Sequence, residues 1–62
     1  LPTNTHDGQE FHYVMEGSVR VKINKYEVVL AEGDSIYFDS AYPHAIWAQG
    51  GRPAKLLVTI TL

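Results

Sequence analysis

Short runs of alternating apolar and polar residues, separated by turn residues, dominate this chain. The clearest run is Ser18 to Asn24, in which Val19, Val21 and Ile23 alternate with polar side chains. Successive side chains of a β-strand point to opposite faces, so this pattern is typical of a strand with one buried face. No stretch has apolar residues at the i, i+3, i+4 and i+7 spacing of a helix. The pattern therefore predicts an all-β fold.

The rest of the sequence predicts five further strands. They span residues 9–16, 26–30, 35–38, 44–48 and 55–62. One face of the last strand carries a row of aliphatic side chains, namely Leu56, Val58, Ile60 and Leu62. Asn24 and Lys25 are the predicted hairpin turn, because Asn tolerates a positive φ better than most residues. Six short strands at close spacing favour a sandwich or a barrel.

The small size of the chain means that its core needs support. A domain of 62 residues buries only about 60% of the surface that its unfolded chain exposes, so it is marginally stable alone. Disulfides, a metal ion or a partner chain usually supply the missing stability. There is no cysteine, which excludes disulfides, cysteine-based zinc sites and thiol nucleophiles. A metal ion or an oligomer remains.

Charge and hydropathy exclude several other classes of protein. The net charge is −2, with only five Lys and Arg residues, whereas a nucleic-acid surface usually has a basic stripe. No apolar run approaches the ~18 residues of a membrane span. The chain begins without Met and without the features of a signal peptide. We therefore expect a cytoplasmic protein, of which this sequence is a fragment or the ordered part.

Three histidines and one glutamate are the candidates for chemistry. His6 lies four residues before Glu10, and His44 lies far along the chain. If the sheet curls into a barrel, these three side chains could meet at one mouth. Two imidazoles and a carboxylate suit a divalent ion such as Fe, Mn, Zn or Ni and leave positions open for a ligand. The alternative is that the histidines share no partner, since this spacing is common by chance.

Two segments resemble the motifs of the cupin superfamily. The run His6–Gly17, HDGQEFHYVMEG, is similar to the first motif, and Gly33–Gly50, GDSIYFDSAYPHAIWAQG, is similar to the second. Fifteen residues separate Gly17 from Gly33, like the compact spacing of microbial cupins. The resemblance implies a single domain over residues 1–62 with a double-stranded β-helix, a small jelly-roll barrel, that is incomplete at its N-terminus.

The resemblance also implies a set of metal ligands. His6 matches the second His of the H-x-H in the first motif, Glu10 matches the Glu of that motif, and His44 matches the His of the second. The chain departs from the family pattern at three positions, which are Asn4 for the first His, Ala41 for a glycine and Ala48 for a late Asn. Asn4 would supply a weak oxygen ligand or none.

The residues of the two motifs are most similar to those of the C-terminal cupin domain in bacterial helix-turn-helix transcription regulators of the xenobiotic-response-element type. This resemblance implies a small-molecule effector-binding domain, with the DNA-binding helices in another part of the protein. The alternative is a stand-alone metal-dependent cupin enzyme, such as a dioxygenase or an isomerase. A third alternative is a metal- or sugar-binding barrel with a structural role. An enzyme is the less favoured function, because Asn4 replaces one histidine of the family's four metal ligands.

Three more residues are candidates for ligand binding. His12 shares a strand face with Glu10, so it is a fourth metal ligand, a donor to a bound ligand, or a hydrogen-bonded wall histidine. Tyr37 and Phe38 are candidate pocket aromatics, although aromatic side chains on strands more often lie in a core or an interface. Missing strands would leave a sheet edge unpaired, so we expect a homodimer that covers this edge.

Overall fold

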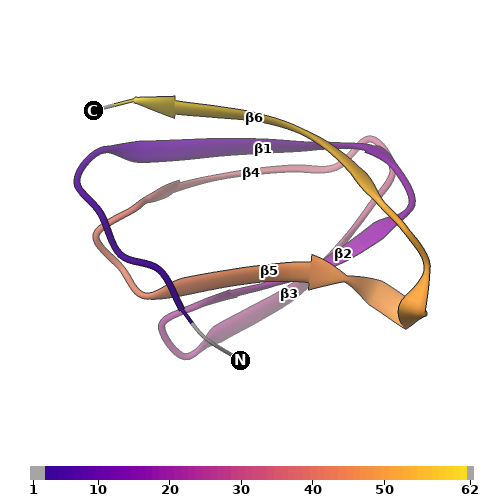
Figure 1. Ribbon diagram of the computed structural model, residues 1–62, viewed down its shortest axis with the longest axis horizontal. Coiled ribbons are helices and arrows are strands. Elements are labelled where there is room, and N and C mark those ends of the chain that lie inside the picture. The colour runs from indigo at the N-terminus through magenta and orange to yellow at the C-terminus, as the bar shows by residue number, and fades with distance from the viewer. Residues whose placement is uncertain (1–2, 62) are drawn as a thin grey trace.

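The computed structural model describes residues 3–61, which form six β-strands and one short 3-10 turn (Figure 1). The strands are β1 (Gln9–Glu16), β2 (Ser18–Ile23), β3 (Tyr26–Ala31), β4 (Ser35–Asp39), β5 (His44–Ala48) and β6 (Lys55–Thr61). The predicted strands are all present, with ends that differ by at most one residue. The prediction for Leu62 lies outside the described residues.

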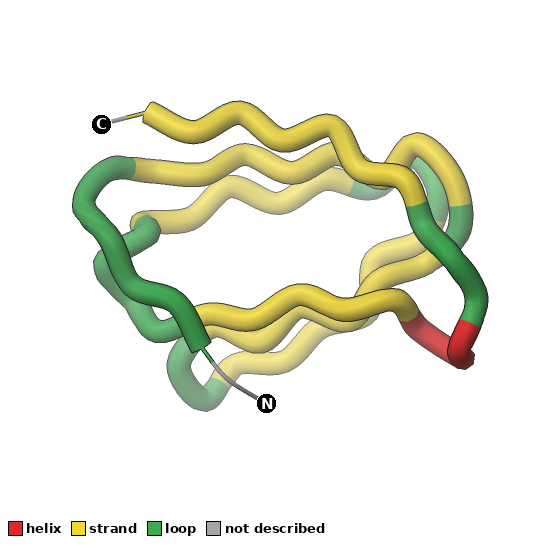
Figure 2. The backbone as a smooth tube through the Cα atoms, viewed as in Figure 1, coloured by secondary structure: helices red, strands yellow, loops and turns green. Residues whose placement is uncertain are grey.

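The strands form two antiparallel sheets of three strands that face each other. One sheet has the order β4-β1-β6 and the other has the order β3-β2-β5. Figure 2 shows the two layers, with the chain crossing between them at both ends. The predicted all-β sandwich is therefore confirmed. Within residues 3–61, no helix is long and apolar enough to cross a membrane.

The core lies between the two sheets and is small. Its buried aliphatic residues are Val14, Val19, Val21 and Leu30. Val19 and Val21 come from the inward face of β2, as the alternation predicted. Cross-strand pairing of Val19 with Leu30 and of Val21 with Val28 continues this apolar surface onto β3, because directly paired residues share a face. Few residues therefore hold the two sheets together.

Two turns are set by residues with a positive φ. Asn24 has φ 54° at the hairpin between β2 and β3, which confirms the predicted turn position. The loop after β5 contains a 3-10 turn, η1 (Gln49–Gly51), inside which Gly50 has φ 70°. No helical element was predicted here. Three residues are too few for the helical periodicity that reveals longer helices in a sequence.

Each sheet has two edge strands, and the outer face of one sheet carries exposed apolar side chains. The edge strands are β4 and β6 in one sheet and β3 and β5 in the other. On the outer face of the first sheet, Phe11, Tyr13, Tyr37 and Leu57 are between 36% and 63% exposed.

The homodimer that the sequence analysis expected stays a prediction. Sedimentation equilibrium tests it, with twice the mass of one chain as the expected result and a monomer at all concentrations as the contrary one.

Candidate metal centre

Three separate segments bring the candidate ligands to one end of the sandwich. His6 precedes β1, Glu10 is the second residue of β1, and His44 is the first residue of β5 in the opposite sheet. Backbone hydrogen bonds fix the segment before β1. The main chains of Asn4 and His44 exchange bonds of 2.9 and 3.1 Å, and the His6 N–H donates to the Ser40 carbonyl at 3.0 Å. This segment therefore ties the two sheets together beside the ligands.

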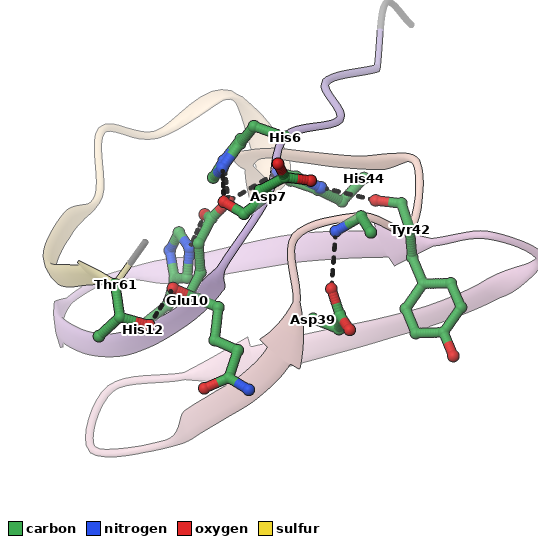
Figure 3. A network of polar contacts seen from close by, with 10 residues as sticks. His6, Asp7, Glu10, His12, Asp39, Tyr42, His44 and Thr61 are labelled. Atoms are coloured by element: carbon green, nitrogen blue, oxygen red, sulfur yellow. Dashed lines mark hydrogen bonds and ion pairs between the residues drawn. The ribbon is translucent and has the colours of Figure 1, made fainter.

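The imidazoles of His6 and His44 converge on one carboxylate oxygen of Glu10 (Figure 3). Glu10 Oε2 lies 2.7 Å from His6 Nε2 and 2.9 Å from His44 Nε2. Glu10 and His44 are each 5% exposed, and the His6 side chain is 37% exposed. The three donor atoms lie within 4.8 Å of one another, so this group could hold a metal ion. The sequence prediction that these three residues meet agrees with this geometry.

The other ring nitrogen of each of these two histidines contacts a backbone carbonyl. His6 Nδ1 is 3.0 Å from the Asp7 carbonyl, and His44 Nδ1 is 2.8 Å from the Tyr42 carbonyl. A carbonyl only accepts hydrogen bonds, so Nδ1 carries the proton in both rings. In the neutral tautomer each Nε2 then presents a lone pair to the Glu10 carboxylate. Three lone pairs facing one another require a cation or added protons between them.

The two donor separations at Glu10 Oε2 are close to those between neighbouring ligands of a divalent transition metal. Metal–nitrogen and metal–oxygen bonds of about 2.1 Å place neighbouring ligands of an octahedral ion about 3.0 Å apart. The observed separations of 2.7 and 2.9 Å need only a small outward movement to match. Carbonyl acceptors on the far nitrogen are also the usual outer partners of metal-bound histidines, because they fix the tautomer and the ring orientation. The residues therefore fit the ion.

Burial and hydrogen bonding shift the pKa values of Glu10 and His6 in opposite directions. Burial raises the pKa of Glu10, but the hydrogen bond from His12, the neighbouring Ser40 hydroxyl and the charge of His44 outweigh it, so the pKa is lowered from 4.5. The Asp7 carbonyl and the Glu10 carboxylate raise the pKa of His6 from 6.5, against the opposing effect of desolvation. An ionised Glu10 and a protonated His6 therefore stabilise each other without metal.

These shifts predict the pH at which the metal-free domain is most stable. The lowered pKa of Glu10 contributes stability that is complete above 4.5 and is lost as the pH falls through the folded-state pKa. The raised pKa of His6 contributes stability that is complete below 6.5 and is lost as the pH rises through the folded-state pKa. In EDTA, the melting temperature of the wild type should exceed that of Glu10→Gln most between pH 4.5 and 6.5. A difference that grows steadily to pH 8 contradicts this prediction.

The structure brings two of the three further candidates to this centre. His12 is 6% exposed and its Nε2 lies 2.7 Å from Glu10 Oε1. The Phe38 ring packs against His12 and against His44, with centroid distances of 5.5 and 4.9 Å. Tyr37 is not brought to the centre. It is 63% exposed and points to the outer face, where its hydroxyl donates to Gln9 Oε1.

Several features of the centre have no signal in the sequence. Ser40 is completely buried, and its Oγ has no hydrogen-bond partner within residues 3–61. The two carbonyls that set the histidine tautomers belong to the main chain, so residue type does not reveal them. Asp39, by contrast, does have a signal in its residue type: its Oδ1 accepts from the Ala41 N–H at 2.9 Å, which is the backbone bond that Asp commonly makes in a turn. An open depression lined by Thr5, His6, Asp7 and Ala41 adjoins the exposed edge of His6.

Comparison with protein families decides the identity of the fold. The family model described as "Cupin domain" matches residues 1–60. The chain belongs to the cupin family. No curated protein and no solved structure is significantly similar to it. The superfamily inferred from the two motifs is thereby confirmed, and the cupin fold accounts for the face-to-face sheets, at one end of which the candidate metal ligands lie.

Proposed function

We propose that this cupin domain is the small-molecule-sensing part of a bacterial transcription regulator and binds its effector at a divalent metal ion. The observation that supports a metal is the convergence of two imidazole nitrogens and one carboxylate oxygen, with a backbone carbonyl against the Nδ1 of each ring. A bound ion would supply Lewis acidity and coordination positions for an oxygen or nitrogen donor of the effector.

The chain's own residues hold the ion and leave one side accessible. His44 and Glu10 are buried, whereas His6 lies at the surface beside the depression lined by Thr5 and Asp7. Three protein ligands leave up to about three positions free on a six-coordinate ion. An effector with a carboxylate, hydroxyl or carbonyl group would therefore reach the ion from the side of His6.

Two measurements test this proposal. Elemental analysis of tag-free protein should find close to one transition-metal ion per chain, and His6→Ala should contain much less. The protein's coding sequence should also encode a helix-turn-helix ahead of Leu1, because the described residues contain no recognition helix. Protein without metal contradicts the metal-dependent mode of binding. A coding sequence without a helix-turn-helix contradicts the regulator role and leaves the metal site intact.

A metal-dependent enzyme is the second candidate, because an ion held by three protein ligands would keep open coordination positions. An ion with open positions can polarise a carbonyl or bind dioxygen. Within residues 3–61, the further histidine in the centre is His12, and its Nε2 already contacts Glu10 Oε1. The domain thus offers no free general base among its described buried residues, so the sensing role fits better. Metal-dependent turnover of a small organic substrate would reverse this preference.

A further inference from the structure

We infer that His12 is a positioning residue, which holds Glu10 Oε1 so that Glu10 binds the ion through Oε2 alone. This inference rests on the proposed metal site. Three histidines contact Glu10, but they divide between its two oxygens. His6 and His44 share Oε2, whereas His12 contacts Oε1 at 2.7 Å. The carboxylate is therefore held at both ends.

The hydrogen bonds of His12 are the reverse of those of the two ligands. Its Nδ1 is buried and has no partner within the described part of the chain, so no carbonyl there accepts a hydrogen bond from it. Its Nε2 faces a carboxylate oxygen, which accepts hydrogen bonds when ionised. The proton of the neutral ring therefore belongs on Nε2. A ring with a proton on Nε2 donates to Glu10 and has no lone pair there for an ion.

The position of the ring supports the same role. The group that could hold an ion consists of His6, Glu10 and His44 and does not include His12. The His12 ring is stacked on Phe38 with an interplanar angle of 16°, and it is 6% exposed. Packing thus fixes the plane of the ring, and the fixed ring in turn fixes Glu10 Oε1. Of the three roles that the sequence left open for His12, this geometry favours the hydrogen-bonded histidine over the fourth metal ligand.

A single-oxygen contact from Glu10 has a consequence for binding. If both carboxylate oxygens bound the ion, they would occupy one more coordination position. His12 keeps Oε1 away from the ion, so the position remains free for an exogenous donor. It also orients Oε2 toward the lone pairs of His6 and His44 before the ion arrives. Outer partners of this kind typically contribute 10–100-fold to metal affinity.

Imidazole ¹⁵N spectra of the Zn²⁺-loaded wild type test the inference directly. We expect His6 and His44 to be protonated at Nδ1 with metal-bound Nε2, and His12 to keep its proton on Nε2. A metal-bound Nε2 in His12, or a proton on its Nδ1, overturns the positioning role. Failure of Zn²⁺ to bind at all would instead contradict the proposed metal site. The two failures are therefore distinguishable.

Two variants of His12 provide an independent measurement. His12→Phe keeps a ring to stack on Phe38 but removes the donor, and it should lower Zn²⁺ affinity by 10–100-fold. His12→Gln keeps an N–H donor and should recover most of that loss. Equal affinity of His12→Phe and wild type would overturn the inference, as would equal weakening by both variants. If His12→Phe does not fold, the ¹⁵N spectra of the wild type decide alone.

Discussion

Replacing His44 with alanine is expected to lower the affinity of the domain for Zn²⁺ or Ni²⁺ by more than about 100-fold. The lower limit follows from outer partners, whose loss already costs up to about 100-fold. His44 is buried, its Nε2 lies 2.9 Å from Glu10 Oε2, and its Nδ1 is held by the Tyr42 carbonyl. Calorimetric titration with a competing chelator measures the change.

Asn4→Ala is the matched control for this prediction. Asn4 occupies the position of a family histidine, but it is exposed and meets His44 through main-chain hydrogen bonds. Alanine retains those bonds, so the affinity for metal should stay within about twofold of the wild type. If Asn4→Ala weakened binding as much as His44→Ala, the amide of Asn4 would be a ligand and the three-residue site would be wrong.

Replacing Gly17 with alanine is expected to reduce the free energy of unfolding by about 3 kcal/mol. Gly17 has φ +79°, and a Cβ there would lie 2.9 Å from the Pro53 carbonyl oxygen and 3.2 Å from Ala54 Cα. The positive φ costs about 1–2 kcal/mol for an L-residue, and displacement of the facing backbone adds to it. A domain of this size has a total stability of about 3–9 kcal/mol, so the substitution would remove roughly a third or more of it.

Gly33→Ala separates the two causes of that loss. Gly33 has φ +89°, but a Cβ at Gly33 would meet nothing within 4 Å. Only the backbone strain of about 1–2 kcal/mol applies. Urea unfolding of both variants should therefore show a clearly larger loss for Gly17→Ala. Equal losses would mean that the contact with Pro53 and Ala54 relaxes without cost and that strain alone matters.

The strands were predictable because their periodicity is local. In β2 the alternation of Val19, Val21 and Ile23 with polar residues reflects burial on one face only, and the structure places these valines in the core. The hairpin was predictable for a similar reason, since Asn24 is a residue that tolerates φ 54°. The family was predictable as well, because the two motifs, one ending at Gly17 and the other beginning at Gly33, can be identified without knowing how the strands pair.

The details of the metal centre depend on pairing that the sequence does not contain. His12 lies on the predicted face, but only the structure shows that it contacts Oε1 of Glu10, whereas His6 and His44 contact Oε2. Tyr37 and Phe38 were both candidates, yet neighbours on a strand point to opposite faces. The strand register pairs Phe38 with Glu10 and Tyr37 with Phe11. This register determines that the Phe38 side chain, and not that of Tyr37, lies at the centre.

The candidate ligands Glu10 and His44 lie in opposite sheets, and this has a consequence for the lifetime of the protein if an ion binds there. An ion bound to His6 and His44 cross-links the chain across a loop of roughly 40 residues, as a disulfide would in a chain with cysteines. Closing a loop of that length removes unfolded-state entropy worth about 4 kcal/mol in the chain-entropy treatment of cross-links. Metal supply would then govern how often this small sandwich opens to proteases, in addition to what it binds.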